Sequence, residues 1–390
     1  MLWVAALQIL AAGCTSQPPG KSRADYRIGY TEMRCDDPRG QFYNWRTQRA
    51  MVVAADGSGR REIAPASVTD ENSWTAFARW WPDGRAVVLA GWEDPKNYAW
   101  EKEHQTFRVT EGSWRLDSCL ANLDSEQVVN LTAVERVSPY NPGLAPWPGD
   151  SGKATFAPVI KGIQHPFVMD ADGRNKRDLS RGAVGFTYAC DVSPDGHRIA
   201  YNKDYVVYIA EEDGANPRRV DDDPRHTFQF IPTWSPDGRW LLFLAGEHYH
   251  CHPHVVRSDG TGLRKLADRG AYRGIFEPLK HPDFHSAGSD LPVWSPDSQW
   301  VYFTAQVGGA VEVMRASIEG HVEQLTHSPA GTEHYYPEVS PDGRLVVFGV
   351  RQEGAAALAV ADADGRNARR VGSPSSDNVQ MYPKWRPLAR

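Results

Sequence analysis

The chain has 390 residues, of which 41% are hydrophobic, and its formal net charge is −6. This length allows a large buried core. The mild acidity argues against a nucleic-acid partner, because contact with phosphates usually needs a basic face. No apolar run reaches the roughly 20 residues that a membrane-spanning helix requires.

The N-terminal residues differ in composition from the rest of the chain. An apolar run ends in Ala11-Ala12-Gly13-Cys14, and a polar stretch, SQPPGKSR, begins two residues later. The small residues before Cys14 resemble the end of a bacterial lipoprotein signal, in which that cysteine is lipidated; an ordinary cleaved export signal and a buried helix are the alternatives. We expect residues 1–25 to be a signal and flexible tether. The resemblance implies a periplasmic protein of the cell envelope, with a lipid anchor in the outer membrane.

Residues 26–390 are expected to form a single domain, in which two short phrases recur. The first phrase appears as WPDGRAVVLAG (81–91), SPDGHRIAYNK (193–203), SPDGRWLLFLA (235–245), SPDSQWVYFTA (295–305) and SPDGRLVVFGV (340–350). The second contains Asp-Gly or Glu-Gly, as in AADGSGRREI (54–63), RSDGTGLRKL (257–266) and DADGRNARRV (362–371). Pro, Asp and Gly in these positions favour tight turns, so each phrase predicts a β-hairpin. The apolar residues after each turn are typical of strands covered on both faces.

One pair of phrases predicts four antiparallel strands, and four-stranded sheets repeated around an axis form a β-propeller. The phrases resemble those of TolB-type propellers, which are relatives of WD-repeat proteins, from Tyr26 to Pro387. Counting the second phrases predicts an all-β propeller with seven blades. No first phrase precedes the strand-like residues 27–31, and residues 382–387 resemble a strand that should precede one. We therefore expect the C-terminal strand to pair into the N-terminal blade and close the ring.

The connections between strands sort onto two faces of such a ring. The turns within the two phrases lie on one face, and the loops between second and third strands lie on the opposite face with the crossovers between blades. Loop length varies on this second face, which we call the loop face: one loop spans about Trp92 to Ser113, and one crossover runs from about Asp268 to Leu291. Variable loops on a rigid scaffold often carry function.

Polar residues recur five positions before the end of each expected inner strand. They are Thr75, Thr187, Gln229, Ser289, His334 and Gln380, and Asp290 follows Ser289. If they converge at the mouth of the central channel, they line a ligand pocket. The alternative is that they cap the ends of the strands and meet water.

Histidines cluster in EHYHCHPH (247–254), which we interpret as a loop between second and third strands on the loop face. In an extended chain His248, His250, His252 and His254 share one side. With His281 and His285 from the next crossover, His248, His250 and His252 are candidate ligands for zinc or another divalent metal. A solvated loop without metal is the alternative, and Cys251 is expected to point away from the histidines. Four cysteines beyond Cys14 are too sparse for a disulfide framework.

Aromatic residues also gather in the blade-two insertion: Trp92, Tyr98, Trp100, Phe107 and Trp114. They are suited either to stacking on sugar rings and anchoring a partner or to packing the insertion's own small core.

Two functions follow from these observations. The first is a binding module, since TolB-type propellers, by resemblance, act through binding; the partner is a protein, peptide or glycan on the loop face, and the chain is expected to be a monomer. The second rests on a more distant resemblance to seven-bladed polysaccharide lyases of the oligogalacturonate and ulvan types, which need a base and a cation beside a uronate. The candidate residues for that chemistry are His334, Tyr335, Tyr188 and His226, with Arg351 as the cation.

Overall fold

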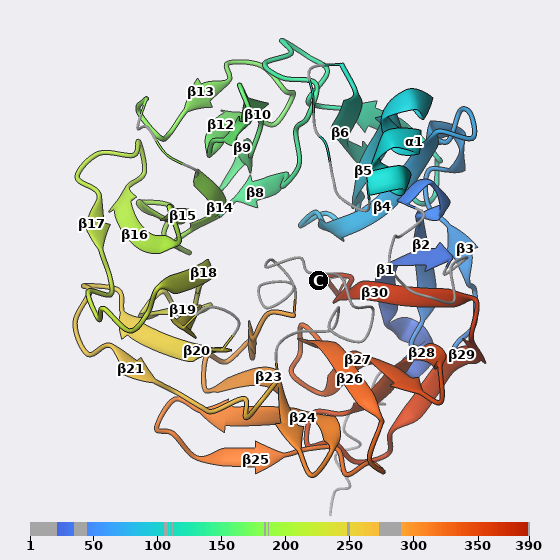
Figure 1. Ribbon diagram of the computed structural model, residues 1–390, viewed down its shortest axis with the longest axis vertical. Coiled ribbons are helices and arrows are strands. Elements are labelled where there is room, and N and C mark those ends of the chain that lie inside the picture. The colour runs from blue at the N-terminus through green and yellow to red at the C-terminus, as the bar shows by residue number, and fades with distance from the viewer. Residues whose placement is uncertain are drawn as a thin grey trace, which may run out of the picture.

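The computed structural model describes residues 22–34, 45–104, 108, 110, 112–182, 185, 187–247, 250–272 and 290–388. Within these residues the chain forms antiparallel sheets placed around a central axis (Figure 1), which confirms the predicted β-propeller. Three short 3-10 helices and one α-helix accompany the strands: η1 (Arg23–Asp25), η2 (Trp45–Thr47), η3 (Pro65–Ser67) and α1 (Pro95–His104).

Five separate sheets of four strands are found in the described part of the chain. The first contains β1 (Arg27–Arg34), β2 (Arg49–Ala54), β3 (Arg61–Glu62) and β30 (Asn378–Trp385), and the second contains β4 (Ser73–Trp80), β5 (Ala86–Glu93), β6 (Trp114–Ala121) and β7 (Val128–Asn130). The third contains β8 (Ala145–Trp147), β9 (Asp150–Phe156), β12 (Phe167–Asp170) and β13 (Arg177–Asp178), beside a small hairpin of β10 (Val159–Ile160) and β11 (Ile163–Gln164). The fourth contains β14 (Thr187–Val192), β15 (Arg198–Lys203), β16 (Val206–Glu211) and β17 (Arg218–Arg219), and the fifth contains β18 (Phe228–Trp234), β19 (Trp240–Glu247), β20 (His250–Arg257) and β21 (Arg264–Lys265).

The remaining described strands form one larger sheet, so the predicted count of seven separate four-stranded blades is wrong. Its eight strands are β22 (Val293–Trp294), β23 (Trp300–Val307), β24 (Ala310–Ser317), β25 (Val322–Gln324), β26 (Glu333–Val339), β27 (Leu345–Gln352), β28 (Ala355–Asp362) and β29 (Arg369–Ser375). The reason is a parallel pairing of β24 with β26, which joins Val311 to Glu333 and continues the sheet where a break was expected.

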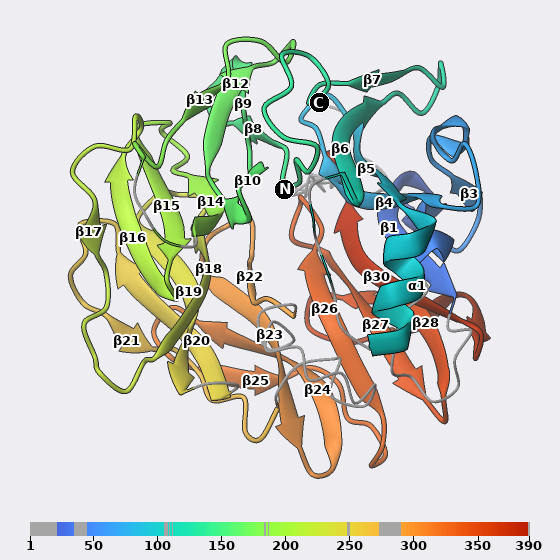
Figure 2. The ribbon, with the colours of Figure 1, turned by 45° about the horizontal axis from the view of Figure 1, so that its top comes forward.

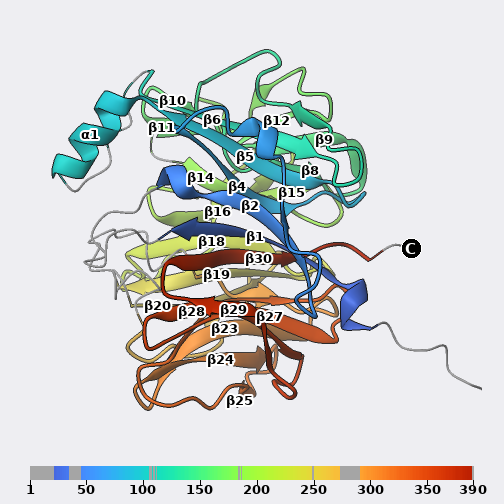
Figure 3. The same ribbon diagram turned by 90° about the vertical axis from the view of Figure 1, so that its right-hand side faces the viewer.

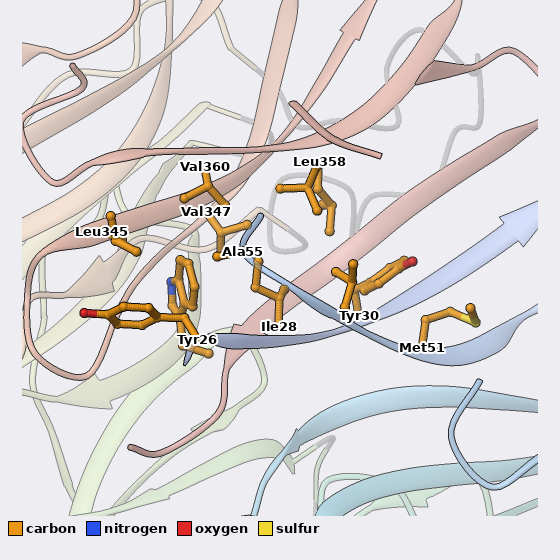
Figure 4. Close-up of a cluster of buried hydrophobic side chains, with 12 residues drawn as sticks. Tyr26, Ile28, Tyr30, Met51, Ala55, Leu345, Val347, Leu358 and Val360 are labelled. Carbon is orange, nitrogen blue, oxygen red and sulfur yellow. The ribbon is translucent and has the colours of Figure 1, made fainter. Parts of the chain in front are cut away.

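The C-terminal strand closes the ring, as predicted. Strand β30 pairs antiparallel with β1, with Ile28 opposite Trp385 and Arg34 opposite Asn378. A hydrophobic cluster fixes this sheet to strands β27 and β28 (Figure 4); it joins Tyr26, Ile28 and Tyr30 to Val347 and Leu358. The first and last strands are therefore held together by both backbone pairing and side-chain burial.

The first phrase forms a turn with a repeated hydrogen-bond pattern. Ser235 Oγ donates to Asp237 Oδ1 at 2.6 Å and accepts the backbone N–H of Trp240 at 3.0 Å. The N–H of Gly238 donates to the carbonyl of Ser235 at 2.8 Å, and Gly238 has φ of 71°. The N–H of Asp237 instead donates to Ser298 Oγ at 3.0 Å. Because the other hydrogen bonds of the turn are local, the phrase specifies a hairpin wherever it occurs.

Strand β19 shows why the apolar runs fit between sheets. Leu241, Phe243 and Ala245 pack into a cluster with the preceding sheet, whereas Leu242 packs into a cluster with the following one. All four side chains are fully buried, which confirms the predicted two-sided burial. Each buried Leu or Phe side chain stabilises the fold by roughly 1.5–3 kcal/mol.

The second-to-third-strand loops differ greatly in length. Two residues connect β15 to β16, β23 to β24 and β27 to β28, whereas residues 94–113 connect β5 to β6. Helix α1 lies in that long connection and stands out from the ring beside the second sheet (Figures 2 and 3). In the described residues no helix has both the length and the apolar character needed to cross a membrane.

Candidate functional site

The polar column at the starts of the inner strands is buried between sheets. Thr75 Oγ1 accepts the N–H of Ala50 on the preceding sheet at 3.1 Å, and Gln229 Oε1 accepts the N–H of Val207 at 2.7 Å. Thr75, Thr187 and Gln229 are fully buried, and Gln380 is 9% exposed. Thr75 and Gln229 thus complete the backbone hydrogen bonding of the neighbouring sheet, which favours a structural role for these two residues. A ligand pocket lined by the column stays a prediction. Ser289 lies outside the described residues.

Asp290 is the centre of a buried network instead of facing a ligand. Its Oδ2 accepts the hydroxyls of Tyr272 at 2.6 Å and Thr304 at 2.5 Å, and its Oδ1 accepts the N–H of Tyr336 at 2.9 Å. Arg269 lies 3.6 Å from the same carboxylate and is 2% exposed. Burial and this carboxylate raise the pKa of Tyr272 well above its ordinary value. The network holds the chain on both sides of residues 273–289.

The predicted lyase residues are not assembled at one place. His334 is 6% exposed and Tyr335 is 1% exposed, and burial lowers the pKa of His334 to about 4. Arg351 makes an ion pair with Glu333, with Nε 2.8 Å from Oε2. These residues lie on β26 and β27, whereas His226 precedes β18; Tyr188 lies on β14, and its side chain is outside the described part of the structure.

The histidine stretch is mostly strand, which corrects its interpretation as a loop. Strand β20 begins at His250, which pairs with Glu247 of β19. His250, His252 and His254 line one cavity, so they share a side as the alternation predicted. Cys251 packs on the other side with Phe230 and Leu244, also as predicted.

This histidine pocket has a volume of about 530 Å³. Its lining residues are Asp223, Arg225, His226, Ala245, Gly246, Glu247, His250, His252, His254, Leu263, Arg264 and Lys265. His226 Nδ1 donates to the buried carboxylate of Asp221 at 2.6 Å, which leaves Nε2 as the basic nitrogen. Burial lowers the pKa of His254 to about 4 and also lowers that of His252. Arg225 and Lys265 are paired with Asp223 and Asp268.

Metal binding by the histidine stretch stays a prediction. His250 and His252 reach the same pocket, but His248, His281 and His285 lie outside the described residues. Among the residues that are described, no group of three or more His, Cys, Asp or Glu side chains is arranged to hold a metal ion.

A second cavity, the aromatic pocket, was not predicted. It has a volume of about 360 Å³ and is lined by Thr31, Gln48, Trp74, Ala76, Phe77, Leu89, Trp114, Leu116, Tyr140 and Tyr382. These residues come from β1, β4, β5, β6 and β30 and from the segments before β2 and before β8. None of these lining residues carries a charge, so the pocket suits a neutral, largely apolar group.

The rings of the aromatic pocket are held in fixed positions. Trp74 and Trp114 meet edge to face with centroids 5.3 Å apart, and Tyr382 lies 4.4 Å from Tyr336. Gly91 allows the first contact, because a Cβ there would lie 2.1 Å from the Trp74 ring. Such close approach is a known reason for glycine within a strand.

Trp114 also contacts a buried pair of carboxyl groups beneath α1. Its Nε1–H donates to Glu101 Oε1 at 3.3 Å, and Asn97 Nδ2 donates to both Glu93 Oε1 at 2.9 Å and Glu101 Oε1 at 3.1 Å. Both carboxyl groups are fully buried. Burial, together with the neighbouring Glu101 carboxyl, raises the pKa of Glu93 to about 7, although Asn97 opposes the shift.

The other aromatic residues of the insertion mostly pack against cations. Arg46 lies 3.5 Å from the centroid of the Tyr98 ring, Arg108 lies 4.3 Å from that of Trp100, and Arg115 lies 5.6 Å from that of Trp92. Phe107 lies outside the described residues. Of the four predicted aromatics that the structure describes, Trp114 alone lines the aromatic pocket.

The cysteines offer no reactive thiol in the described structure. Cys119, Cys190 and Cys251 are free, and burial raises the pKa of each; for Cys119 and Cys251 it rises to about 12. Cys14 and Cys35 lie outside the described residues.

Comparison with known proteins places the fold in a family. An uncharacterized protein of Agrobacterium fabrum is 25% identical over 176 residues, which cover 42% of this chain and 53% of that protein. The uncharacterized peptidase YuxL of Bacillus subtilis is 27% identical over 192 residues, which cover 40% of this chain and 28% of the peptidase. The chain thus spans about half or less of these relatives' lengths.

One solved structure has a similar fold over most of the chain. An oligogalacturonate lyase in complex with manganese has a TM-score of 0.54 and 12% sequence identity, and the match covers 83% of each chain; at this identity the likeness concerns the fold alone. The family model for the TolB beta propeller domain matches residues 163–387, more than half of the chain. The chain therefore belongs to the TolB beta-propeller family, as the repeated phrases indicated.

Proposed function

We propose that this chain is a partner-binding propeller, and that the partner is a peptide segment of a protein that inserts an aromatic side chain into the aromatic pocket. The observation that carries the proposal is an uncharged cavity of about 360 Å³ walled by Trp74, Phe77, Trp114, Tyr140 and Tyr382. Buried aromatic residues in well-formed pockets supply most of the energy at protein interfaces. Membership in the TolB family supports a protein partner over a small metabolite.

The position of the pocket supports the same reading. Trp114 begins β6 directly after the long α1 insertion, and Tyr140 lies in the crossover before β8. Both segments belong to the loop face, where the connections vary most in length. A partner bound there would meet the insertion as well as the pocket.

A titration with small aromatic probes tests this proposal. N-acetyl-L-tryptophanamide is expected to bind the wild-type chain, and binding is expected to be lost in Ala76→Leu, because the added carbons fill the pocket without removing a ring. Val322→Ala, at an exposed position on β25, is the matched control and should bind as wild type does. Calorimetry that finds no binding of tryptophan or phenylalanine amides, or binding only of a neutral disaccharide, would contradict a peptide partner.

Polysaccharide lysis is the second candidate, favoured by the His226–Asp221 pair at the wall of the histidine pocket. A histidine oriented by a buried carboxylate is suited to act as a general base. Arg264 lines the same pocket, but its guanidinium donates to the carbonyl of Ile318 and would have to leave that contact to face a uronate. The fold of oligogalacturonate lyase lends the idea some support. Release of unsaturated uronate products that is lost in His226→Ala but kept in His334→Ala would favour the lyase over simple binding.

We also propose the cell envelope as the location, with Cys14 as the lipid attachment. The support is the resemblance of the residues before Cys14 to a lipoprotein signal and the family membership. Fractionation of cells tests this: the wild type should sediment with the outer membrane, and Cys14→Ser should not.

A further inference from the structure

Two carboxyl groups are buried side by side where the α1 insertion meets the second sheet. Glu93 is the last residue of β5 and Glu101 lies in α1, and neither side chain is exposed to solvent. Asn97 Nδ2 donates to one oxygen of each. Among the described residues, the remaining Oε2 atoms of Glu93 and Glu101 have no hydrogen-bond partner. The donors to the pair are neutral groups of Asn97, Trp114 and the Arg108 backbone. Two carboxylates buried side by side repel each other, so the arrangement favours a proton on one of them.

The pair also fixes one wall of the aromatic pocket. Glu101 Oε1 accepts the indole N–H of Trp114 at 3.3 Å and the backbone N–H of Arg108 at 2.6 Å. Trp114 in turn lies opposite Glu93 in the pairing of β5 with β6. The ring of Trp114 meets Trp74 inside the pocket. A change in the protonation of the carboxyl pair can therefore affect the pocket through one side chain, that of Trp114.

We propose that Glu93 and Glu101 share one proton, and that loss of this proton to solvent releases the α1 insertion and Trp114 and thereby weakens binding in the aromatic pocket. This inference rests on the proposed function of that pocket. The protonated pair holds the helix against the sheet; when the proton leaves, two negative charges remain in one buried space, and Glu101 is pushed outwards with α1. Trp114 then loses its acceptor, and the wall that it forms opens.

The charges around the pair decide the pH range. Arg46 from η2 is the cation whose field acts on Glu93 and favours its ionised form, but burial and Glu101 outweigh it, so that the pKa of Glu93 rises to about 7. Arg108 donates from Nε to Asn97 Oδ1 at 2.9 Å, and Asp94 accepts the N–H groups of Lys96 and Asn97 at the start of the helix. The other described charged or titratable groups on α1 are Lys96, Tyr98, Lys102, Glu103 and His104, and those on β6 are Arg115, Asp117 and Cys119.

Replacing Glu93 with glutamine supplies a test with little change of shape. The amide that Glu93→Gln introduces would keep an acceptor for Asn97 and offer an N–H to Glu101, so this variant mimics the protonated pair at every pH. Wild-type affinity for N-acetyl-L-tryptophanamide is expected to fall by roughly tenfold or more between about pH 5.5 and about pH 8.5, since a pKa difference of one unit between two states is worth a factor of ten. Glu93→Gln is expected to keep the higher affinity at both pH values. An equal pH dependence in wild type and Glu93→Gln, or none in wild type, would overturn the inference.

Hydrogen exchange provides a readout that does not depend on the probe. After correction for the intrinsic effect of pH, protection of the amides in residues 95–104 is expected to fall at the higher pH in the wild type but not in Glu93→Gln. Amides of β19 serve as the internal control and should not change. If the probe binds at no pH while the exchange of α1 follows this pattern, the proposed function fails and the proton-linked release of the insertion stands. Exchange of α1 that is independent of pH would contradict the release itself.

Discussion

Single residues with positive φ carry much of the turn geometry. Gly343 closes the last first-phrase turn with φ of 71°, and a Cβ built there would meet no atom within 4 Å. Glycine is therefore needed at this position for its backbone conformation, and not because a side chain would clash. Glu353 is a contrasting case, since it has φ of 52° although it carries a side chain.

We predict that Gly343→Ala lowers the free energy of unfolding by about 1–2 kcal/mol, the cost of a left-handed conformation for a residue with Cβ. Urea unfolding measures the change. The matched substitution Glu353→Gly removes a Cβ at positive φ and should be neutral or stabilising; a Gly343→Ala chain as stable as wild type would show that the turn tolerates another conformation.

The buried carboxyl pair predicts how stability depends on pH. The pKa of Glu93 is raised from 4.5 to about 7 in the folded chain, so between these values the folded state holds a proton that the unfolded state has lost. The stability contributed by this proton is present below about pH 4.5, falls as the pH rises towards 7, and is lost above it. We compare the free energy of unfolding of Glu93→Gln with that of wild type at each pH. This difference should be more favourable to the variant at pH 8 than at pH 4.5, by on the order of 1–3 kcal/mol. Chemical unfolding at the two pH values checks this; a difference that grows towards acid pH would have the wrong sign.

At the scale of elements, the tight turns could be predicted from the sequence, whereas the burial of polar segments such as β20 and α1 could not. The Ser-Pro-Asp-Gly phrase predicted hairpins correctly because the hydrogen bonds that Ser235 and Gly238 make in the turn are local. EHYHCHPH was interpreted as a loop from its position between the second and third strands of its unit, yet residues 250–254 lie in β20, where pairing with β19 outweighs their polar character. Helix α1 was missed because its buried residues include Asn97 and Glu101, so no apolar periodicity marks it.

Strand β30 should be indispensable, since it supplies the edge that closes the first sheet. A chain truncated before Val379 loses the pairing with β1 and the ring of Trp385, which lies 5.8 Å from that of Tyr26. We predict that this truncation abolishes cooperative thermal unfolding, because β1 is left as an open edge. Calorimetry would contradict the prediction if the truncated chain melted in one transition near the wild-type temperature.

At the scale of the whole molecule, the ring and its closure could be predicted from repeated phrases, but the division into sheets could not. One parallel pair, Val311 with Glu333, decides that eight strands form a single sheet, and no repeated phrase reports on it. The aromatic pocket was not predicted, for a similar reason. Trp74 and Tyr382 read as ordinary strand residues, and they meet Tyr140 only because three distant segments of the chain converge.

The histidine pocket was foreseen in part. Alternation along 247–254 correctly placed His250 and His252 on one side, since side-chain direction in a strand is a local property. The involvement of His226 and Asp221 depends on the crossover before β18, whose course the sequence does not specify. The role of the polar column could not be settled from the sequence, because a strand start that faces a neighbouring sheet and one that faces a channel have the same residue pattern.

The central claim is that the aromatic pocket is where a partner's aromatic side chain binds, and a crystal structure with N-acetyl-L-tryptophanamide tests it most directly. The indole is predicted to lie inside the aromatic pocket, in contact with Trp74, Trp114 and Tyr382, at neutral or lower pH. A probe bound on the opposite face, or in the histidine pocket with the aromatic pocket unoccupied, would contradict it.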